Sequence, residues 1–387
     1  MQSLDEEWKT ALTVVVTIII WAGMLSIFAP WSPNDKPLFD VWFYYAAQNP
    51  EGGALAYPIG ALAYFDIMRE FSANATIFSH IFKLLTFFWL GVMLCTYGKM
   101  YGKRKIAEIS VIFSFMIFVL NGTVEIFAVS LALLGAYLFM TERRMPGWAL
   151  VVFATFVKVF PIFLLPLFFI LEMKKWREGA PRVALAALLG LALFACSSAT
   201  LDSIAYQAGR GLQFQDIYAN ALMIVNMFHG IGVYSDYITG SLDLVVPPSL
   251  GFLMPLSTIL QIGSVLAVIG LFFLEKNKEE KFWVYAFLVL AVAVFFGKIS
   301  STQFMFWPIA FAIPLAKMKK YELILSACFA LSFVSLLNFP LFWDAMENLM
   351  PVGIAVITAR NLLLGAMIAY VGSGLFEKRA GVGKHVR

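Results

Sequence analysis

The chain has 387 residues, of which 61% are hydrophobic and only 13% are charged. A soluble domain is about half apolar and about a quarter charged, so the composition excludes a soluble globular protein and predicts a polytopic membrane protein. The net charge of +4 is small, so no nucleic-acid partner is indicated.

Several apolar runs have about the length of one membrane-spanning helix, which takes roughly 20 residues. In chain order these predicted spans are residues 11–30, 77–98, 183–200, 251–274, 321–339 and 352–376. The residues before the first run are acidic rather than basic, and no small-residue cleavage site follows it. We therefore expect the first run to be a retained span and not a cleaved signal peptide.

Further apolar runs are too long for one span and short for two, namely residues 109–140, 148–173 and 282–316. Basic clusters recur along the chain, at residues 99–105, 143–144, 174–182, 276–281, 317–320 and 378–387. The positive-inside rule is obeyed if all of these clusters are cytoplasmic, and each long run then starts and ends on that side. Each long run is therefore predicted to be a hairpin of two short helices. The fold predicted is all-α, with about twelve membrane helices and both termini cytoplasmic.

The predicted hairpin tips are polar and read LNGTVE (120–125), VKVFP (157–161) and GKISSTQ (297–303). Short hairpins place these tips below the outer lipid surface, where a charge costs at least about 2.5–3.5 kcal/mol on insertion scales. We therefore expect the charged residues of the tips to face a shared hydrophilic cavity that is open to the non-cytoplasmic side; these residues are Glu125, Lys158 and Lys298. The alternative is three ordinary tight loops with snorkelling lysines.

Two long segments are expected outside the membrane, residues 31–76 and 201–249. Both are too short and too aromatic to be independent domains, and stretches such as residues 217–228 are typical of helices that lie at the membrane interface. Residues 1–387 are therefore predicted to form a single membrane domain.

Asp40 lies among aromatic residues in the first external segment, shortly after the first predicted span. In a short helix, Asp40 and Tyr44 would share one face. A carboxylate that is partly desolvated beside aromatic rings gains basicity, which suits a general base that takes a proton from a hydroxyl. The alternative roles are a helix cap and a solvated loop acid.

Arg210 is the only basic residue between Arg182 and Lys276, which is unusual for an isolated arginine on the outer face. Its guanidinium suits bidentate binding of a phosphate. The alternative is a surface ion pair with Asp202 or Asp216, which would contribute little to stability.

Lys158 and Lys298 come from different hairpins at equivalent depths, and two converging cations would suit a lipid phosphate. Gln303, in the same tip as Lys298, offers hydrogen bonds to a sugar. His229 is either a proton carrier or a structural loop histidine. The pair Arg360–Asn361 lies inside the last predicted span, either as a structural anchor or as a head-group contact.

The sequence contains no phosphate-binding glycine loop and no His, Cys and Glu spacing that suits zinc. The cysteines, Cys95, Cys196 and Cys328, lie far apart in apolar runs, which predicts neither a disulfide framework nor a metal site. No metal and no cofactor are therefore expected.

Taken together these features resemble the GT-C membrane glycosyltransferases, most closely the bacterial and archaeal family of polyprenol-phosphate-mannose-dependent mannosyltransferases. The matching stretches are Asp40 with Tyr44 and Tyr45, AYP (56–58), NGTVE (121–125), KVFPIFLLPL (158–167), RGLQFQD (210–216) and GKISSTQFMFWPIA (297–310). The two lysine-bearing hairpins are the more specific of these signals.

The resemblance implies a GT-C-like fold and sugar transfer on the non-cytoplasmic face of the cell membrane. The donor would be a polyprenyl-phosphate sugar, with mannose implied by the family, and the acceptor a hydroxyl of a glycolipid or glycan. Asp40 takes the role of catalytic base, and direct attack would invert the anomeric centre. Trp42 stands where related GT-C families often carry a second acid, so a metal-bridged acidic pair is not implied.

The remaining candidate residues divide between the two substrates. Donor-phosphate binding is assigned to Arg210, Lys158 and Lys298. Sugar or acceptor binding is assigned to Tyr44, Tyr45, Glu125, Gln303 and His229.

Two other classes of function compete with this interpretation. Short hairpins and buried lysines also occur in transporters, so a transporter or flippase of an anionic lipid-linked sugar is the main alternative. Against it, the chain shows no inverted repeat and its polar tips gather on one side. A scaffold subunit of a membrane complex would leave Asp40, Lys158 and Lys298 without a shared purpose.

Overall fold

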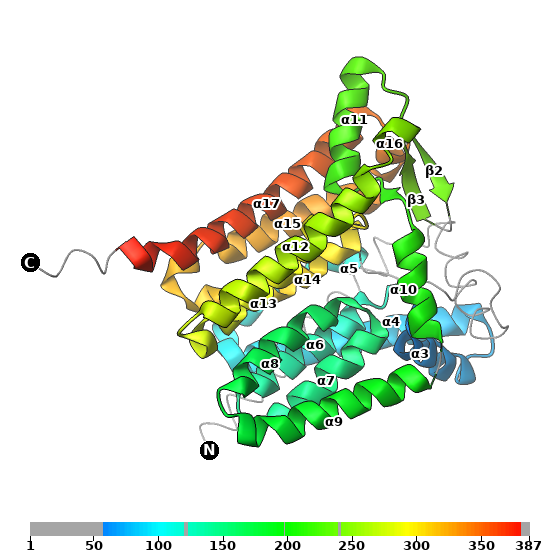
Figure 1. Ribbon diagram of the computed structural model, residues 1–387. Helices are drawn as coiled ribbons and strands as arrows, with labels where there is room; N and C mark the ends of the chain where they lie inside the picture. The colour runs from blue at the N-terminus through cyan, green and yellow to red at the C-terminus, as the bar shows by residue number, and fades with distance from the viewer. Residues whose placement is uncertain (1–56, 120–122, 197, 239–240, 381–387) are drawn as a thin grey trace, which may run out of the picture. The chain divides into compact units, whose positions relative to one another are not determined.

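The computed structural model describes residues 57–119, 123–196, 198–238 and 241–380 (Figure 1). Asp40, Tyr44, Tyr45 and the first predicted span lie outside the described residues. The chain divides into two compact units, with unit 1 ending at Arg210 and unit 2 beginning at Gly211. That both units belong to a single membrane domain stays a prediction.

Unit 1 is built from helices joined by short turns. Its helices are α3 (Ile59–Glu70), α4 (Ala75–Tyr101), α5 (Lys103–Val119), α6 (Glu125–Met140), α7 (Arg144–Val157), the 3-10 helix η2 (Phe160–Leu164), α8 (Leu165–Met173), α9 (Trp176–Ala195) and α10 (Ala199–Gly209).

The two long apolar runs of unit 1 break where the sequence predicts. The run 109–140 separates into α5 and α6 around the tip 120–124, and the run 148–173 separates into α7 and α8 at Lys158. Pro161, in the first turn of η2, has no backbone N–H to continue the preceding helix. The division of each run into two helices is confirmed for this unit, and the hairpin arrangement of these helices in the membrane stays a prediction.

Helices α6 and α7 form an antiparallel hairpin whose backbones approach closely. Gly135 and Gly147 face each other across it: a Cβ atom on Gly147 would lie 2.8 Å from the Gly135 carbonyl oxygen and 2.7 Å from Phe139 Cβ. Small residues permit such close contact between apolar helices. The hairpin packs against α4 through α6 and against α3 and α9 through α7.

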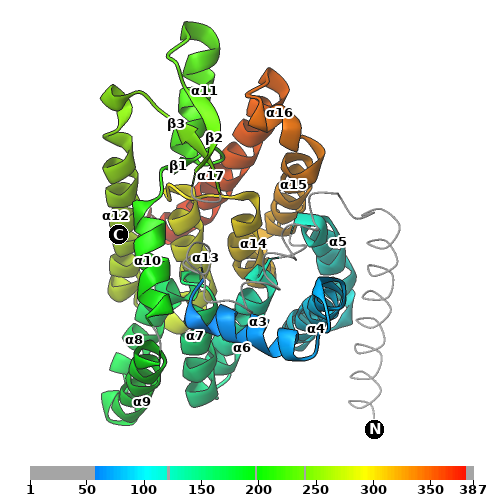
Figure 2. The same ribbon diagram turned by 90° about the vertical axis from the view of Figure 1, so that its right-hand side faces the viewer.

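Unit 2 contains further helices and a small antiparallel sheet (Figure 2). Its elements are β1 (Leu212–Gln213), α11 (Ile217–His229), β2 (Tyr234–Ile238), β3 (Ser241–Val245), η3 (Pro248–Leu250), α12 (Leu253–Leu274), α13 (Lys278–Phe295), η4 (Thr302–Met305), α14 (Phe306–Ala312), η5 (Ile313–Lys317), η6 (Lys319–Tyr321), α15 (Ile324–Leu336), the π-helical turn η7 (Leu337–Leu341), α16 (Trp343–Glu347) and α17 (Pro351–Ala380).

The sheet of unit 2 has the strand order β1–β3–β2, and all its pairs are antiparallel. The sequence analysis predicted only helices in residues 201–249, so these strands are an addition to the all-α prediction. Buried residues of the sheet, such as Leu212 and Leu244, share a core with Met223 of α11 and Ile357 of α17. The helix predicted at 217–228 is confirmed as α11, and its place at a membrane interface stays a prediction.

The third long run, 282–316, also behaves as predicted. It separates into α13 and α14 around the tip 297–303. Helix α13 is buried along most of its length, and it packs against α12, α14 and α17.

Among the described residues, five helices are long and apolar enough to cross a membrane. They are Thr76–Tyr101, Trp176–Ala195, Pro248–Leu274, Lys319–Leu341 and Pro351–Leu375. The corresponding predicted spans are confirmed as apolar helices, although α9 begins earlier than predicted, inside the basic cluster 174–182. The protein is therefore a mostly helical membrane protein, and the count of about twelve spans stays a prediction.

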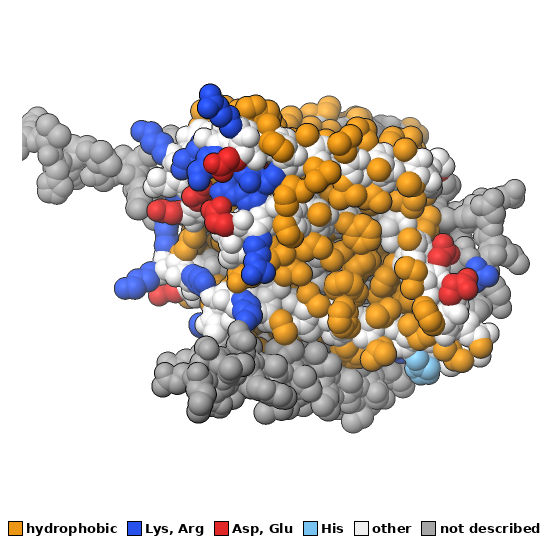
Figure 3. All heavy atoms as spheres, turned by 90° about the horizontal axis from the view of Figure 1, so that it is seen from below, with side chains coloured by type: hydrophobic (Ala, Val, Ile, Leu, Met, Phe, Trp, Pro, Cys, Tyr) orange, Lys and Arg blue, Asp and Glu red, His pale blue; other side chains and the backbone are white. Residues whose placement is uncertain are grey.

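The lower face in Figure 1, where α9 lies, separates apolar from basic side chains. Hydrophobic side chains cover the middle of this face, and Lys and Arg side chains gather at one end (Figure 3). The turns that join α6 to α7 and α8 to α9 carry basic residues, such as Arg143 and Lys174. This is the arrangement that the positive-inside rule describes.

Replacing Gly147 by alanine is expected to destabilise unit 1. Its Cβ atom would meet the α6 backbone, because the Phe139 amide nitrogen would lie 2.8 Å away. Overpacking of this kind costs about 1–3 kcal/mol. Thermal unfolding of the purified protein in detergent measures the effect.

The control is Gly263→Ala in α12, where a Cβ atom would have open space around it. This change should raise stability by about 0.5–1 kcal/mol, because alanine loses less conformational freedom in a helix. Equal unfolding midpoints for Gly147→Ala and the unchanged protein would contradict the close α6–α7 packing.

Candidate functional site

At one end of unit 1, an ion pair joins two helix termini. Glu125 is the first residue of α6, and Lys158 directly follows α7. The Lys158 Nζ atom lies 2.9 Å from Glu125 Oε1, with Glu125 fully buried and Lys158 only 12% exposed. Each charge also suits its helix end, since the N-terminus favours an anion and the C-terminus a cation.

Tyr57 completes this group of side chains. Lys158 Nζ lies 4.8 Å from the centre of the Tyr57 ring, within the range of a cation–π contact. Burial raises the pKa of the Tyr57 hydroxyl, the negative charge of Glu125 raises it further, and Arg210 opposes this rise. The phenol therefore stays protonated and neutral at physiological pH.

Close packing of α3 on α7 holds Tyr57 over Lys158. A Cβ atom on Gly60, in the first turn of α3, would lie 2.6 Å from the Phe156 carbonyl oxygen in the last turn of α7. No larger residue fits between the two backbones at this point. The glycine thus sets the distance between Tyr57, just before α3, and Lys158, just after α7.

The structure therefore brings together two residues that the sequence assigned to different substrates. The snorkelling interpretation of Lys158 is wrong, because its ammonium group is mostly buried and paired with Glu125. The pair carries no net charge, and the charge of Arg210 acts on the nearby Tyr57 hydroxyl, where it lowers the pKa. The predicted convergence of Lys158 with Lys298 involves both units and stays a prediction.

In unit 2 a second polar cluster is centred on Arg360 of α17, which is fully buried. Its guanidinium donates to the backbone carbonyl oxygens of Gln215 and Ser300, the latter at 3.1 Å. It also donates to the side-chain oxygen of Asn361 at 2.9 Å. Arg360 thus ties α17 to the segment before α11 and to the tip that follows α13.

Further hydrogen bonds close the same network. The Gln215 side-chain oxygen accepts from the Thr302 amide at 2.8 Å and from the Thr302 hydroxyl at 3.1 Å. Asn220 of α11 donates to Thr358 of α17 at 3.0 Å. The Gln213 amide donates to the Lys298 carbonyl oxygen at 2.9 Å, so β1 also holds the tip.

Asp216 joins this network as the cap of α11. Its side-chain oxygen accepts from the Ala219 amide at 2.7 Å, which satisfies a backbone donor at the start of the helix. Burial raises the pKa of the Asp216 carboxyl well above its usual range, whereas the amides of Ala219 and Tyr218 and the charge of Arg360 oppose this rise. Asp216 is therefore a helix cap.

The other predicted residues of unit 2 lie at different distances from the Arg360 network. Lys298 and Gln303 are half-buried and belong to the tip that the network holds. His229 is exposed in the last turn of α11, and it takes no part in the contacts described above. Of the two roles considered for the Arg360–Asn361 pair, the structure favours the structural anchor over the head-group contact. The Arg360 guanidinium donates hydrogen bonds to Gln215, Ser300, Thr302 and Asn361.

Sequence reasoning did not find Tyr57, Asn220 or Thr302 as members of these clusters. Tyr57 was part of the quoted AYP stretch, but nothing in the sequence indicated that it would lie over Lys158. Asn220 and Thr302 are neutral polar residues next to predicted motifs, and their only signal was the adjoining RGLQFQD and GKISSTQ stretches.

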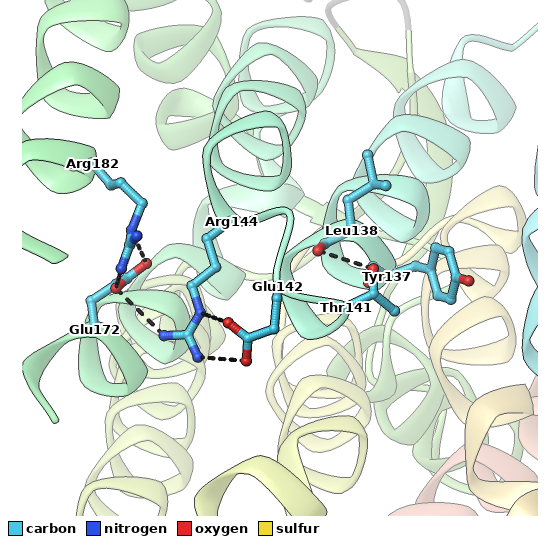
Figure 4. Close-up of polar contacts among 7 residues, drawn as sticks. All are labelled: Tyr137, Leu138, Thr141, Glu142, Arg144, Glu172 and Arg182. Carbon is cyan, nitrogen blue, oxygen red and sulfur yellow. Dashed lines mark hydrogen bonds and ion pairs between the residues drawn. The ribbon is translucent and has the colours of Figure 1, made fainter. Parts of the chain in front are cut away.

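At the basic end of unit 1, Glu172 is buried between two arginines (Figure 4). Arg182 of α9 donates to both carboxylate oxygens, at 3.0 and 2.8 Å. Arg144 Nη1 lies 3.5 Å from Glu172 Oε2, and Arg144 also pairs with the exposed Glu142. The four side chains neutralise one another and join α7, α8 and α9, so we interpret this cluster as structural.

The described residues define a mostly helical membrane protein, with several helices that are long and apolar enough to span a membrane. Comparison of the sequence with known proteins does not narrow this class. No family model matches the chain, and a search of the curated proteins finds no match. Any narrower function must therefore be argued from the polar clusters themselves.

Replacing Lys158 by methionine is expected to destabilise unit 1, because it leaves the buried Glu125 carboxylate without its ion-pair partner. Removing one member of a buried pair costs about 3–5 kcal/mol. The double variant Glu125→Leu, Lys158→Met should recover most of this loss, because both charges are then absent. Thermal unfolding in detergent provides the measurement. A double variant no more stable than Lys158→Met would disprove the coupling.

Replacing Glu172 by glutamine should also lower the unfolding free energy, by about 3–5 kcal/mol, because it leaves two arginines without their shared anion. The matched control is Glu178→Gln, which removes the same charge from an exposed position on α9. The control should change stability by less than about 0.5 kcal/mol. Similar losses in both variants, measured by thermal unfolding, would show that Glu172 has no special place in the packing.

Proposed function

We propose that this protein is a membrane glycosyltransferase that transfers a sugar from a polyprenyl-phosphate donor to a lipid-linked or glycan hydroxyl on the non-cytoplasmic face. Mannose is the sugar that the family resemblance favours. The proposal includes a GT-C-like fold for the complete chain.

The observation that carries the proposal is the docking of the tip 297–303 onto the segment 213–216 through Arg360. These stretches belong to two motifs of the resemblance, GKISSTQ and RGLQFQD, and more than eighty residues separate them. Their contact supports the view that the motifs serve one site. Within unit 1, the buried Glu125–Lys158 pair likewise joins two stretches of the resemblance, NGTVE and KVFPIFLLPL.

The proposed reaction needs only groups of the chain and its two substrates. Asp40 takes the proton from the acceptor hydroxyl, and the oxygen attacks the anomeric carbon of the donor sugar. The bond from this carbon to the phosphate oxygen breaks, its electron pair leaves with the polyprenyl phosphate, and the configuration inverts. Charge on the departing phosphate is stabilised by Arg210, Lys298 and the ammonium of Lys158.

The ion pair with Glu125 bears on the role proposed for Lys158 in phosphate binding. Because Glu125 pairs with Lys158, the charge that Lys158 would bring to the donor phosphate is partly neutralised. The proposal leaves sugar and acceptor contacts with the same set of residues, namely Tyr44, Tyr45, Glu125, Gln303 and His229.

The test is sugar transfer in membranes that contain the unchanged protein or Asp40→Asn. Labelled polyprenyl-phosphate mannose serves as donor, and total lipid extract as acceptor. We expect a labelled product from the unchanged protein and at least about a hundredfold less from Asp40→Asn, since general base catalysis contributes about 10²–10⁴-fold. The matched control is Asp66→Asn, an exposed carboxylate of α3 whose loss should leave transfer unchanged.

Two outcomes would contradict the proposal. Full transfer by folded Asp40→Asn would remove the base role. Movement of the labelled donor across vesicles containing the purified protein, without formation of a new glycosidic bond, would favour the transporter.

A further inference from the structure

The turn that joins α8 to α9 carries an unbalanced positive charge. Together with the first residues of α9 it reads KKWRE over residues 174–178, so Lys174, Lys175 and Arg177 face a single acid, Glu178, and all four side chains are exposed. We call Lys174, Lys175 and Arg177 the α9 basic patch. Arg143, also exposed, lies in the neighbouring α6–α7 turn, which Arg144 connects to this region through Glu172.

The acids Glu172 and Glu142, which lie near the patch, do not offset its charge, because each of them pairs with an arginine outside the patch. Glu172, the buried acid nearest in sequence, is occupied by Arg182 and Arg144. The exposed Glu142 pairs with Arg144. Among the described residues, Glu172 and Glu142 are therefore committed to the arginines of the structural cluster, and Glu178 alone opposes the three cations of the patch.

The patch lies where an apolar surface ends. Helix α9 is one of the candidate spans, and its large apolar side chains are exposed along its length, namely Leu185, Leu188, Leu191 and Phe194. Trp176 stands between the basic residues, half exposed, and packs edge-on against Phe169 at 5.9 Å. Tryptophan is typical of the boundary between hydrocarbon and head groups. Figure 3 shows the same succession of hydrophobic and basic side chains on this face.

We propose that the α9 basic patch binds the head groups of anionic phospholipids in the membrane leaflet at the basic end of unit 1. The patch combines charge complementarity to a phosphate with a position at head-group depth, beside a lipid-facing helix. The start of α9 adds a favourable partial positive charge, since a helix N-terminus attracts anions. This inference does not rest on the proposed glycosyltransferase activity.

A second turn in the same protein provides a matched comparison. The α12–α13 turn reads EKNKEEK over residues 275–281, in which three lysines meet three acids. Lys281 pairs with Glu275 at 2.6 Å, and Lys278 donates to the Glu275 carbonyl oxygen. This segment likewise adjoins a candidate span, α12, but its charges balance, so it should not favour anionic lipids.

The experiment reconstitutes the purified full-length protein into nanodiscs of equimolar dioleoyl phosphatidylglycerol and dioleoyl phosphatidylcholine. Lipids that stay bound after transfer to detergent are counted by native mass spectrometry. The unchanged protein is compared with the triple variant Lys174→Gln, Lys175→Gln, Arg177→Gln. The control is the triple variant Lys276→Gln, Lys278→Gln, Lys281→Gln.

We expect the unchanged protein and the control to retain phosphatidylglycerol in preference to phosphatidylcholine. Because each basic residue near an anionic surface strengthens binding by roughly fivefold, the patch variant should lose at least about fivefold of this preference. Since the changed residues are exposed, the patch variant should keep the thermal unfolding midpoint of the unchanged protein, which verifies that it is folded.

Three results would overturn the inference. One is an equal preference for both lipids in the unchanged protein, and another is an equal loss in the patch and control variants. The third is displacement of the retained phosphatidylglycerol by millimolar inorganic phosphate, which would identify a site for the free anion instead of the lipid.

Discussion

A charged side chain among apolar helices loses the solvation of water, and the described part of this protein meets that constraint by pairing. Glu125 is compensated by Lys158, Glu172 by Arg182 and Arg144, and Arg360 by a set of oxygens. Without such partners the desolvation cost of a buried ion exceeds the stability available from local packing. The positions of the turns follow from these contacts, because each pair or network joins separate helices.

Both ends of unit 1 contain a buried glutamate in an ion pair, but the two ends differ in how many cations surround it. Helix α6 runs from Glu125 to Met140, a rise of about 24 Å at 1.5 Å per residue, so the Glu125 pair and the Glu172 cluster lie at opposite ends of the α6–α7 hairpin. At the basic end, the buried acid is shared by two arginines and the remaining cations stay on the surface. At the other end, one lysine meets one acid beside a neutral tyrosine.

Unit 2 meets the constraint with neutral partners. Arg360 contacts backbone carbonyls and amide side chains, and Asp216, the acid of the adjoining segment, mainly caps α11. A network of this kind holds loops at fixed positions without needing a counter-ion. That property suits the proposed site, because Lys298 belongs to the tip that the network holds.

The sequence by itself determined the membrane class, the apolar helices and the places where the long runs break. These features depend on local properties: apolar length, basic flanks, and residues such as Pro161 that cannot continue a helix. The charged tips with Lys158 and Lys298 and the isolated Arg210 could likewise be singled out from the sequence, whereas their assignment to motifs came from the resemblance. Tertiary structure decided which of their residues meet. The pairing of Glu125 with Lys158, the placement of Tyr57 by Gly60 and the capture of Gln215 and Ser300 by Arg360 join residues that are distant in sequence. A hydrophobic pattern in the sequence indicates where a single helix or strand lies. Contacts between distant residues depend on how the helices pack against one another, so no local signal could have specified them.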